Sequence, residues 1–476
     1  MLVYNSLTFQ KEKFEPLNPD KVLMYVCGPT VYDSPHLGHA KSAVAFDLIR
    51  RYLEYKGFNV KIVKNYTDID DKIIKRANEK NMDFKALSEK YIEEYDTIMQ
   101  VLNIKPESRT PKATEIIDFM IEVIQTLIEK GYAYESNGSV YFAVKTYPGY
   151  NTIFQNKEEE EYIEYEIPED EQPLYGDKYD PNDFVLWKAW KEGEPYWESP
   201  WGKGRPGWHI ECSCMALRFL GDVIDIHGGG LDLKSPHHKN EIVQSTAYTG
   251  EDIFAKYFLH NGFIEVDQEK MSKSLGNFFL VSDLLEKFDP MVIRFFLISS
   301  HYRSSANFSM NSIQQAENTY EKMLNTIKKI HELNPVDKES QQLIDLNSKI
   351  EQTKIKIIEA MDNDFGTPEA LAEILKLFNE INRVVFEKNI DITEQFKDQF
   401  LGFIEELEQI FGIFPDLRKK LKLGIIEPIG EKDKLIKNLL NIINETREEL
   451  RKRKLYEISD KIREKLQDLG INLEDK

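Results

Sequence analysis

One stretch near the start of the chain constrains the fold more than any other. An apolar strand is predicted from Val22 to Val26, and a Gly-Pro turn and a long amphipathic helix follow it as far as Gly57. A second apolar strand, in FNVKIVKNYTD, comes directly afterwards. Because strand, helix and strand in this order favour parallel pairing, we expect an α/β domain with a Rossmann-like, nucleotide-binding sheet.

The same alternation returns after a long interruption. Strand, glycine loop and helix are predicted within GDVIDIHGGGLDLKSPHHKNEIVQSTAYTG and again within YFLHNGFIEVDQEKMSKSLGNFFLVSDLLEKF. The interruption contains a helix from Ile116 to Lys130, short strands in GYAYESNGSVYFAV, and the acidic run KEEEEYIEYEIPEDE, which we interpret as a solvated loop. We therefore expect an inserted α+β region and a sheet that is discontinuous in sequence.

Beyond about Gln315 the chain is predicted to form long helices with few glycines, which is typical of an all-α helical bundle. The whole chain is then expected to have five parts. Two halves of the catalytic domain occupy 1–111 and 206–262, the inserted connective region occupies 112–205, a region with a lysine-rich loop occupies 263–314, and the helical region occupies 315–476.

Composition excludes several classes of protein. The chain of 476 residues has three cysteines, too few for a disulfide framework, so we expect a reducing compartment. No stretch approaches the roughly 20 apolar residues of a membrane span, and the N-terminal stretch lacks the pattern of a signal peptide, so we expect a cytoplasmic protein without a membrane partner. A net charge of -20 argues against nonspecific nucleic-acid binding but leaves room for a local basic face.

The stretch SPHHKNE, residues 235–241, is a first candidate site. Ser235 is a favourable N-cap and Pro236 a favourable first helical residue, so we expect a helix to begin here. His237 and Glu241 then share a face four residues apart, a spacing that allows both to bind one metal ion, whereas His238 is expected to point elsewhere. A solvated His-Glu pair is the alternative interpretation.

The cysteines favour the metal interpretation. Cys27 ends the first strand, and Cys212 and Cys214 lie in GWHIECSC, which is predicted to border the same crevice. Zinc prefers thiolate, imidazole and carboxylate ligands in a tetrahedron. The spacing does not choose between Cys212 and Cys214, and buried cysteines that pack as small apolar side chains remain the alternative.

Three glycine- or lysine-containing motifs are candidates for phosphate and nucleotide binding. The quartet from His36 to His39 opens a helix, where Gly38 allows close approach and the helix N-terminus favours an anion. KMSKS, from Lys270 to Ser274, places two lysines in a loop that suits a polyphosphate, although a lysine-rich surface loop is the alternative. HGGG, from His227 to Gly230, is predicted to follow a strand and to permit close backbone approach.

Taken together, these stretches resemble the cysteinyl-tRNA synthetases, a family of class I aminoacyl-tRNA synthetases. The resemblance covers nearly the whole chain and rests on YVCGPTVYD, HLGHA, TDIDDKII, DIHGGG, PHHKNE, KMSKSLGNFF and RFFLISSHYRS. Three departures stand out, because Leu37 replaces the usual isoleucine, and Ser235 and Lys239 stand where the family usually has phenylalanine and glutamate.

The resemblance implies one zinc ion per subunit and a choice between the cysteines. Matched residue by residue, the zinc ligands are Cys27, Cys212, His237 and Glu241, which sets Cys214 aside. Zinc bound there would accept the thiol of the substrate as a thiolate, which a serine hydroxyl cannot replace. Such a contact would select cysteine without a separate editing step.

The resemblance also implies the reaction and its catalytic residues. The enzyme would activate L-cysteine with Mg²⁺-ATP to cysteinyl-adenylate and transfer cysteine to the terminal adenosine of tRNA(Cys). The implied catalytic residues are His36, His39, Lys270 and Lys273. The implied ATP-binding residues are Gly28, Thr30, His36, Gly38, His39, Gly228, Gly229, Gly230, Lys270, Met271, Ser272, Lys273 and Ser274.

Substrate and tRNA contacts follow from the same resemblance. Cys27, Thr67, Trp208 and His209 would form the cysteine pocket, although packing alone would also explain Trp208. The region 263–314 would carry the KMSKS loop and contact the tRNA stem. The helical region 315–476 would read the anticodon of the tRNA, and its basic residues between Lys432 and Lys454 are candidates for that contact, with solvated helix faces as the alternative. We expect a monomer.

Two other functions fit part of the pattern. An ATP-dependent ligase that joins cysteine to an amino-sugar shares the zinc pocket and both signatures, but its relatives lack the long helical region found after Gln315. A noncatalytic tRNA-binding paralogue would have lost signature lysines or metal ligands, and none is lost here.

Overall fold

The structure is a computed structural model that describes residues 1–155, 177–266, 269–271, 278–422, 459 and 462. It divides into two compact units. The first comprises residues 1–318 and 334–415, and the second comprises residues 319–333 and 416–476. The predicted acidic loop and the predicted basic stretch of the C-terminal region lie outside the described residues.

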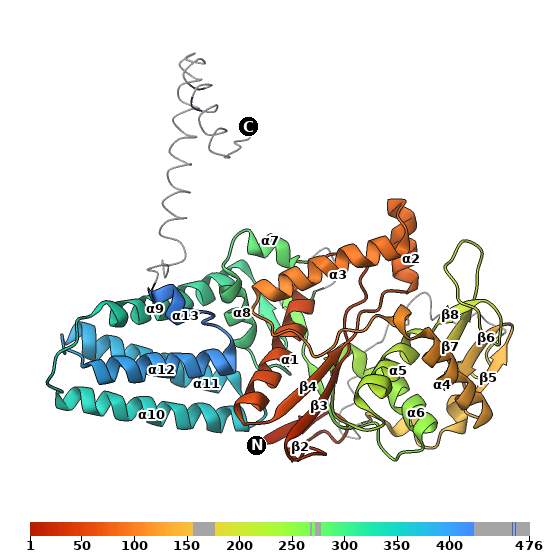
Figure 1. Ribbon diagram of the computed structural model, residues 1–476, viewed down its shortest axis with the longest axis horizontal. Helices are drawn as coiled ribbons and strands as arrows, with labels where there is room; N and C mark the ends of the chain where they lie inside the picture. Colours follow the sequence, from red (N-terminus) through yellow and green to blue (C-terminus); the bar gives the residue numbers. More distant parts are fainter. Residues whose placement is uncertain (156–176, 267–268, 272–277, 423–458, 460–461, 463–476) are drawn as a thin grey trace. The chain divides into compact units, whose positions relative to one another are not determined.

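A parallel four-stranded sheet forms the centre of the first unit, as the sequence predicts (Figure 1). Its strand order is β10-β9-β3-β4, and every neighbouring pair is parallel. The strands are β3 (Lys21–Val26), β4 (Asn59–Lys64), β9 (Ile224–Gly230) and β10 (Ala255–Asn261). Strands β3 and β4 are apolar at most buried positions, since helices cover the sheet.

Helix α1 (Leu37–Tyr55) links β3 to β4 and buries an apolar face against the sheet. Its buried side chains include Val44, Leu48 and Leu53. Helices α5 (Trp208–Leu220) and α6 (Lys239–Thr249) pack against each other and flank β9 in the sequence. Because α1 connects two parallel neighbours, the crossover that the sequence predicts is confirmed.

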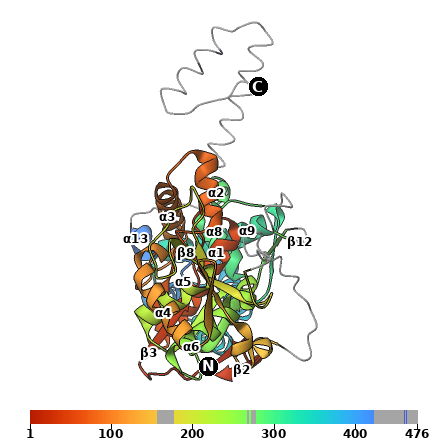
Figure 2. The same ribbon diagram turned by 90° about the vertical axis from the view of Figure 1, so that its right-hand side faces the viewer.

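The segment between β4 and β9 contributes helices and a second sheet. Helices α2 (Asp71–Lys80) and α3 (Phe84–Val101) lie next to each other in two views (Figures 1 and 2). Helix α4 (Ile117–Glu129) confirms the predicted helix to within one residue at each end. The antiparallel sheet that follows consists of β5 (Ala133–Ser136), β6 (Ser139–Phe142), β7 (Phe184–Ala189) and β8 (Gly204–Pro206).

The first unit also contains several short strands and helices outside the central sheet. The first two strands form a hairpin, and three short strands form a separate sheet of order β12-β11-β13. These elements are β1 (Leu2–Asn5), β2 (Gln10–Lys13), β11 (Ile264–Val266), β12 (Glu269–Lys270), β13 (Ala306–Phe308), α7 (Val281–Leu285) and α8 (Pro290–Ile298).

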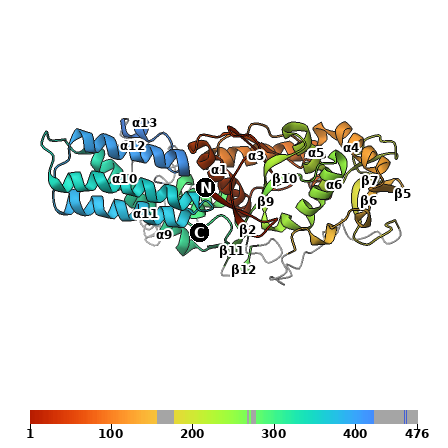
Figure 3. The same ribbon diagram turned by 90° about the horizontal axis from the view of Figure 1, so that it is seen from below.

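Long helices follow, as predicted for the C-terminal region, and three of them pack together as neighbours (Figure 3). These three are α10 (Gln341–Asp362), α11 (Thr367–Ile381) and α12 (Glu394–Phe411). Helix α9 (Met310–Glu332) runs from the first unit into the second, and α13 (Leu417–Lys422) belongs to the second. Among the helices that the structure describes, none has the length and apolar character of a membrane-spanning segment.

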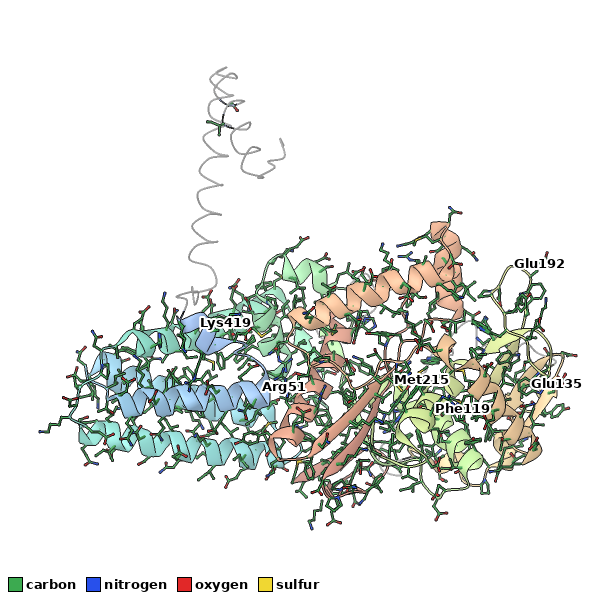
Figure 4. All side chains as sticks on the ribbon, in the orientation of Figure 1. Arg51, Phe119, Glu135, Glu192, Met215 and Lys419 are labelled. Carbon is green, nitrogen blue, oxygen red and sulfur yellow. The ribbon has the colours of Figure 1, made fainter. Side chains whose placement is uncertain are left out.

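A buried ion pair joins α1 to the rest of the first unit. Asp47 on α1 accepts hydrogen bonds from Arg51, at 2.7 Å, and from Arg294 of α8, at 2.5 Å. Arg294 also donates to the carbonyl of Phe411 at the end of α12, at 2.8 Å. Arg51, labelled in Figure 4, donates to the carbonyl of Glu408, which is also on α12. The helical region and the sheet are therefore joined through α1.

Candidate functional site

The candidate site lies where β3 and β9 end. The chain leaves β3 through α1 toward β4 on one side, and it leaves β9 through α6 toward β10 on the other. Diverging connections of this kind open a crevice at the carboxyl ends of parallel strands. The backbone N–H of Cys27 donates to the carbonyl of Gly228 at 2.9 Å, so residues from two distant parts of the chain meet there.

The turn after β3 is held against the residues that follow β4. The backbone N–H of Gly28 donates to Oδ1 of Asn65 at 2.8 Å, and Thr30 pairs with Thr67 as an isolated bridge. A Cβ atom at position 28 would lie 1.7 Å from the carbonyl oxygen of Asn65, so only glycine fits. The turn thus brings Thr67, a predicted substrate residue, beside the end of β3.

His36 and His39 cap the first turn of α1. His36 is the N-cap residue, and its Nδ1 accepts the N–H of His39 at 3.3 Å, while Nδ1 of His39 accepts the N–H of His36 at 3.2 Å. The two rings stack with centroids 3.7 Å apart. Because Nδ1 acts as an acceptor in both, the neutral rings carry their protons on Nε2, which suits donation to phosphate oxygens.

The HGGG motif differs from the prediction. His227 to Gly230 form the last part of β9 rather than a loop after it, because the backbone stays extended and pairs with both β3 and β10. A Cβ atom at Gly228 would lie 2.2 Å from Phe46 of α1, so the glycine lets helix and strand pack closely. The glycines nevertheless lie at the predicted sheet edge.

Four predicted metal ligands meet beneath this edge. The donor atoms of Cys27, Cys212, His237 and Glu241 all lie within 4.8 Å of one another and are buried. Sγ of Cys27 lies 3.5 Å from Oε1 of Glu241, and Nε2 of His237 lies 3.1 Å from the same oxygen. Ligands of one tetrahedral zinc ion, bound at about 2.0–2.3 Å, lie about 3.3–3.8 Å apart. The distance from Cys27 to Glu241 falls in this range and that from His237 to Glu241 is slightly shorter, so small side-chain shifts suffice for a shared ion.

The structure also shows a second possible quartet, which the sequence analysis missed. Cys27 and Glu241 belong to it together with His227 and His238. Nε2 of His238 lies 4.0 Å from Oε1 of Glu241, so the expectation that His238 points elsewhere is wrong. Residues three apart on a helix are neighbours just as residues four apart are. Cys214 is buried but belongs to neither group found among the described residues.

The start of α6 also differs from the prediction. The helix begins at Lys239 with His238 as its N-cap residue, not at Ser235. Residues Lys234–His238 form a single π-type turn, η5, in which Ser235 keeps an extended backbone. His237 therefore lies on the turn before the helix, and Glu241 on the first turn of the helix.

Burial and the imidazoles control the charges in the cluster. Burial raises the pKa of the Cys27 thiol well above its usual range and also raises that of Cys212. Burial alone would raise the pKa of Glu241 as well, but His227 and His237 hold it below its usual range. Oε2 of Glu241 is buried without a hydrogen bond from any described residue. A carboxylate and two buried thiols in this state suit a bound cation, which stabilises thiolates.

The predicted cysteine-pocket residues surround the same cluster. The ring of Trp208 lies over that of His237 with centroids 4.2 Å apart, and Nδ1 of His209 lies 2.9 Å from Nδ1 of His237. The hydroxyl of Thr67 donates to Oε2 of Glu211 at 3.0 Å. Trp208 and His209 therefore contact the quartet through His237, whereas Thr67 is linked to it through Glu211, the residue before Cys212.

Two further polar residues of this region, Asn65 and Glu211, are not among the predicted site residues. Asn65 accepts from Gly28 and donates to the Thr67 hydroxyl at 3.2 Å. Glu211 is fully buried, and burial together with the Asp70 charge raises its pKa well above the usual range. Both had a signal in the sequence, because Asn65 directly follows a parallel strand and Glu211 directly precedes Cys212.

The KMSKS segment is described only at its start. Lys270 ends β12, and the backbone N–H of Met271 donates to the carbonyl of Ile264 at 3.0 Å. A Cβ atom at Gly38 would lie 3.7 Å from Cε of Met271, so the segment begins beside the histidine quartet. Ser272, Lys273 and Ser274 lie outside the described residues.

A cavity of about 420 Å³ adjoins the cluster on the side of the inserted sheet. Its wall includes Lys188, Arg205, His209 and Asn240. Asp71, also in the wall, forms ion pairs with Lys188, at 2.6 Å, and with Arg205. His209, in this wall, contacts His237, so the cavity ends one residue away from the predicted metal ligands.

Comparison with known proteins identifies the family. The family described as tRNA synthetases class I (C) catalytic domain matches residues 13–318, and the DALR domain matches residues 356–415. Fold and site thus define a class I aminoacyl-tRNA synthetase. The cysteine–tRNA ligase of Thermococcus onnurineus is 45% identical to this chain over 477 residues, which covers 99% of this chain and 97% of that protein. The cysteine–tRNA ligase of Carboxydothermus hydrogenoformans is 46% identical over 475 residues, which covers 100% of this chain and 98% of that protein. The chain belongs to the cysteine–tRNA ligase family, whose members are ligases.

Solved structures agree on the fold. Mycobacterium tuberculosis methionyl-tRNA synthetase in complex with methionyl-adenylate matches with a TM-score of 0.62 at 14% identity, over 84% of this chain and 93% of that chain. An Agrobacterium radiobacter LeuRS complex matches with a TM-score of 0.60 at 11% identity, over 84% of this chain and 85% of that chain. These likenesses concern the Rossmann-like architecture alone.

Proposed function

We propose that this chain forms cysteinyl-adenylate from L-cysteine and Mg²⁺-ATP and then transfers the cysteinyl group to the terminal adenosine of tRNA(Cys). One observation carries the proposal. The thiol-, imidazole- and carboxylate-containing quartet of Cys27, Cys212, His237 and Glu241 lies at the sheet edge that also carries His36 and His39. This arrangement supports a reaction in which amino-acid recognition and nucleotide chemistry take place next to each other.

In the first step, a carboxylate oxygen of cysteine attacks the α-phosphorus of ATP while the bond to the bridging oxygen breaks and pyrophosphate leaves. The protein contributes position and charge. His36 and His39 donate from Nε2 to the oxygens of the reacting phosphorus, since both Nδ1 atoms accept backbone N–H groups. Gly28, Thr30, Gly38 and the glycines of β9 line the approach of ATP. Lys270 and Lys273, with Met271, Ser272 and Ser274 around them, bind the departing pyrophosphate.

We assign a zinc ion to Cys27, Cys212, His237 and Glu241. When bound, zinc supplies a soft Lewis acid that takes the substrate thiol as a thiolate. The short contact between His237 and Glu241 favours this quartet over the one with His238, whose Nε2 lies farther from the carboxylate. The paired His209 ring also gives His237 the outer partner that metal-binding histidines usually have.

The remaining pocket residues hold the rest of the amino acid. Thr67 and Glu211 form a buried hydrogen-bonded pair that would face the ammonium group of cysteine. Trp208 packs over His237 and limits the size of the side chain that fits. A pocket built around one specific sulfur contact rejects the hydroxyl analogue by about 10⁴–10⁵, which makes editing of serine unnecessary.

In the second step, the 2′-hydroxyl of the terminal adenosine attacks the carbonyl carbon of the adenylate, and AMP leaves. The cavity that reaches from the inserted sheet to His209 is the proposed entry for the tRNA end, and its wall carries Lys188 and Arg205. The basic residues between Lys432 and Lys454, outside the described part of the chain, are proposed to contact the tRNA farther along. We also propose a cytoplasmic monomer, in keeping with a tRNA substrate.

Two assays test this function. Purified protein should catalyse pyrophosphate exchange into ATP that depends on cysteine and not on serine, and it should charge tRNA(Cys). Exchange without charging would favour the cysteine:amino-sugar ligase, and binding of tRNA without exchange would favour a noncatalytic paralogue. In a Lys273→Ala variant, exchange at the wild-type rate would refute the role given to that lysine.

A further inference from the structure

Lys41 is a buried lysine on α1 that the reaction described above does not use. Its side chain is only 2% exposed. The amine donates to the carbonyl oxygens of Phe263, at 3.2 Å, and of Ser304, at 2.5 Å. Burial lowers the pKa of Lys41 to about 8, against the attraction of Glu265. A desolvated amine held by two main-chain carbonyls joins separate segments of backbone.

Both carbonyls belong to residues that precede strands of the three-stranded sheet of order β12-β11-β13. Phe263 directly precedes β11, Ser304 lies shortly before β13, and the two strands pair in parallel. Strand β11 turns back into β12, where Glu265 pairs with Lys270. Lys41 on α1 therefore holds the start of β11, the strand that is followed by β12 and then by the KMSKS segment.

The far end of that segment is fastened to the same helix by another means. The backbone N–H of Val281 donates to the carbonyl of Pro35 at 3.0 Å, and that of Leu37 donates to the carbonyl of Phe279 at 3.1 Å. These bonds bracket His36, which pairs with Leu280 as an isolated bridge. Main-chain hydrogen bonds thus hold the exit of the segment, whereas the base of its entry is held by the Lys41 side chain.

We propose that Lys41 is a positioning residue that sets the distance between the two nucleotide-binding signatures, by holding the strand that leads to Lys270 against the helix that begins with His36 and His39. The kinetic effect that we expect of Lys41 rests on the proposed function, whereas its effect on the structure does not. Lys41→Met keeps most of the side-chain volume and removes both donors. Lys41→Arg keeps donors and charge.

Hydrogen–deuterium exchange of the full-length protein tests the structural part. In Lys41→Met, the amides of 263–266, 269–271 and 304–308 should exchange roughly ten- to a hundredfold faster, because two hydrogen bonds of ordinary net strength are lost, while β1 and β2 remain unchanged. Lys41→Arg should restore much of the protection. Lys130→Met is the matched control, because Lys130 also donates to two main-chain carbonyls, those of Ala247 and Tyr248, in another part of the unit. Unchanged exchange in Lys41→Met overturns the proposal.

Steady-state kinetics test the positioning part. In cysteine-dependent pyrophosphate exchange, kcat/KM for ATP should fall at least roughly tenfold in Lys41→Met while KM for cysteine stays constant, because the two lost hydrogen bonds are of ordinary strength and lie outside the proposed metal pocket. Faster amide exchange with wild-type kinetics overturns the positioning role.

Two further measurements keep the outcomes separate. Thermal unfolding shows whether Lys41→Met folds, and Lys41→Leu, which also removes both donors, takes its place if it does not. A wild-type protein that binds ATP without cysteine-dependent exchange refutes the proposed function alone. The dissociation constant of ATP, measured by calorimetry, must then rise in Lys41→Met, and an unchanged constant overturns the inference.

Discussion

Nε2 of His237 lies 3.1 Å from Oε1 of Glu241, although the two residues belong to different elements, a π-type turn and the helix that follows it. This pair forms one quartet of donors with Cys27 and Cys212, while His227 and His238 form a second quartet with Cys27 and the same carboxylate. One ion cannot be held equally by both sets, so variants of each set distinguish them.

The first prediction concerns the metal. Cys212→Ser should lose bound zinc, because a serine hydroxyl is a poor ligand for this ion. His238→Asn, in contrast, should retain about one zinc per chain, since that side chain belongs only to the other quartet. Elemental analysis of the purified variants by mass spectrometry provides the measurement. Retention of zinc by Cys212→Ser together with its loss from His238→Asn would reverse the assignment.

The second prediction concerns His39. Asparagine at this position keeps a side-chain acceptor for the N–H of His36 and removes Nε2. We expect cysteine-dependent pyrophosphate exchange to slow about 10²–10³-fold, as when one donor to a developing charge is lost, with little change in the melting temperature. A melting temperature that falls in step with activity would indicate that the histidine acts through the helix cap instead.

The third prediction concerns the buried Arg294, which joins α8 to Asp47 and to the end of α12. Arg294→Met should lower the free energy of unfolding by about 3–5 kcal/mol, because it removes one of the two arginines that compensate the buried charge of Asp47 and also leaves the carbonyl of Phe411 without its donor. Arg383→Met, which breaks an exposed pair with Glu380, should cost less than about 1 kcal/mol. Urea unfolding of both variants gives the comparison, and equal losses would contradict it.

The fourth prediction concerns the pH dependence that Asp47 contributes. Burial would raise the pKa of Asp47, but Arg294 and Arg51 hold it below its usual range. A lowered folded-state pKa gives stability that is fully present above the unfolded-state pKa of about 3.9 and is lost as the pH falls through the folded-state value. The stability difference between wild type and Asp47→Asn should therefore be largest near neutrality and shrink below about pH 4. A difference that grows in acid would refute this sign.

Much of the fold follows from local patterns in the sequence. The apolar run before Cys27 and the 3.6-residue period of α1 predict β3, the helix and the parallel neighbour β4, because these signals act over a few residues. The π-type turn before α6 is not predictable in the same way, since Ser235 and Pro236 carry the ordinary signature of a helix start. Glycine has little strand propensity, so HGGG predicts a loop, although pairing on both sides keeps these residues in β9.

The candidate site, like the fold, can be predicted from the sequence only in part. Residue types and spacing suggest a metal near Cys27 and His237, but they leave Cys212 and Cys214 equivalent, because the direction of each side chain depends on how α5 packs. The roles of His227, Glu211 and Asn65 arise from contacts between parts of the chain that are far apart in the sequence. Cys27 and His227, for example, are in contact although 200 residues separate them along the chain. Periodicity carries no information about pairings of that length.

The order β10-β9-β3-β4 has a consequence for how the chain is made. Strand β3 emerges from the ribosome early, but its neighbour β9 is roughly 200 residues behind, which at about 5–20 residues per second is a delay of about 10–40 seconds. Throughout that interval one edge of β3, with Cys27 at its end, has no strand beside it. The half-built sheet therefore exposes an apolar strand edge during synthesis, and the proposed metal-binding quartet is complete only after Cys212, His237 and Glu241 have been made.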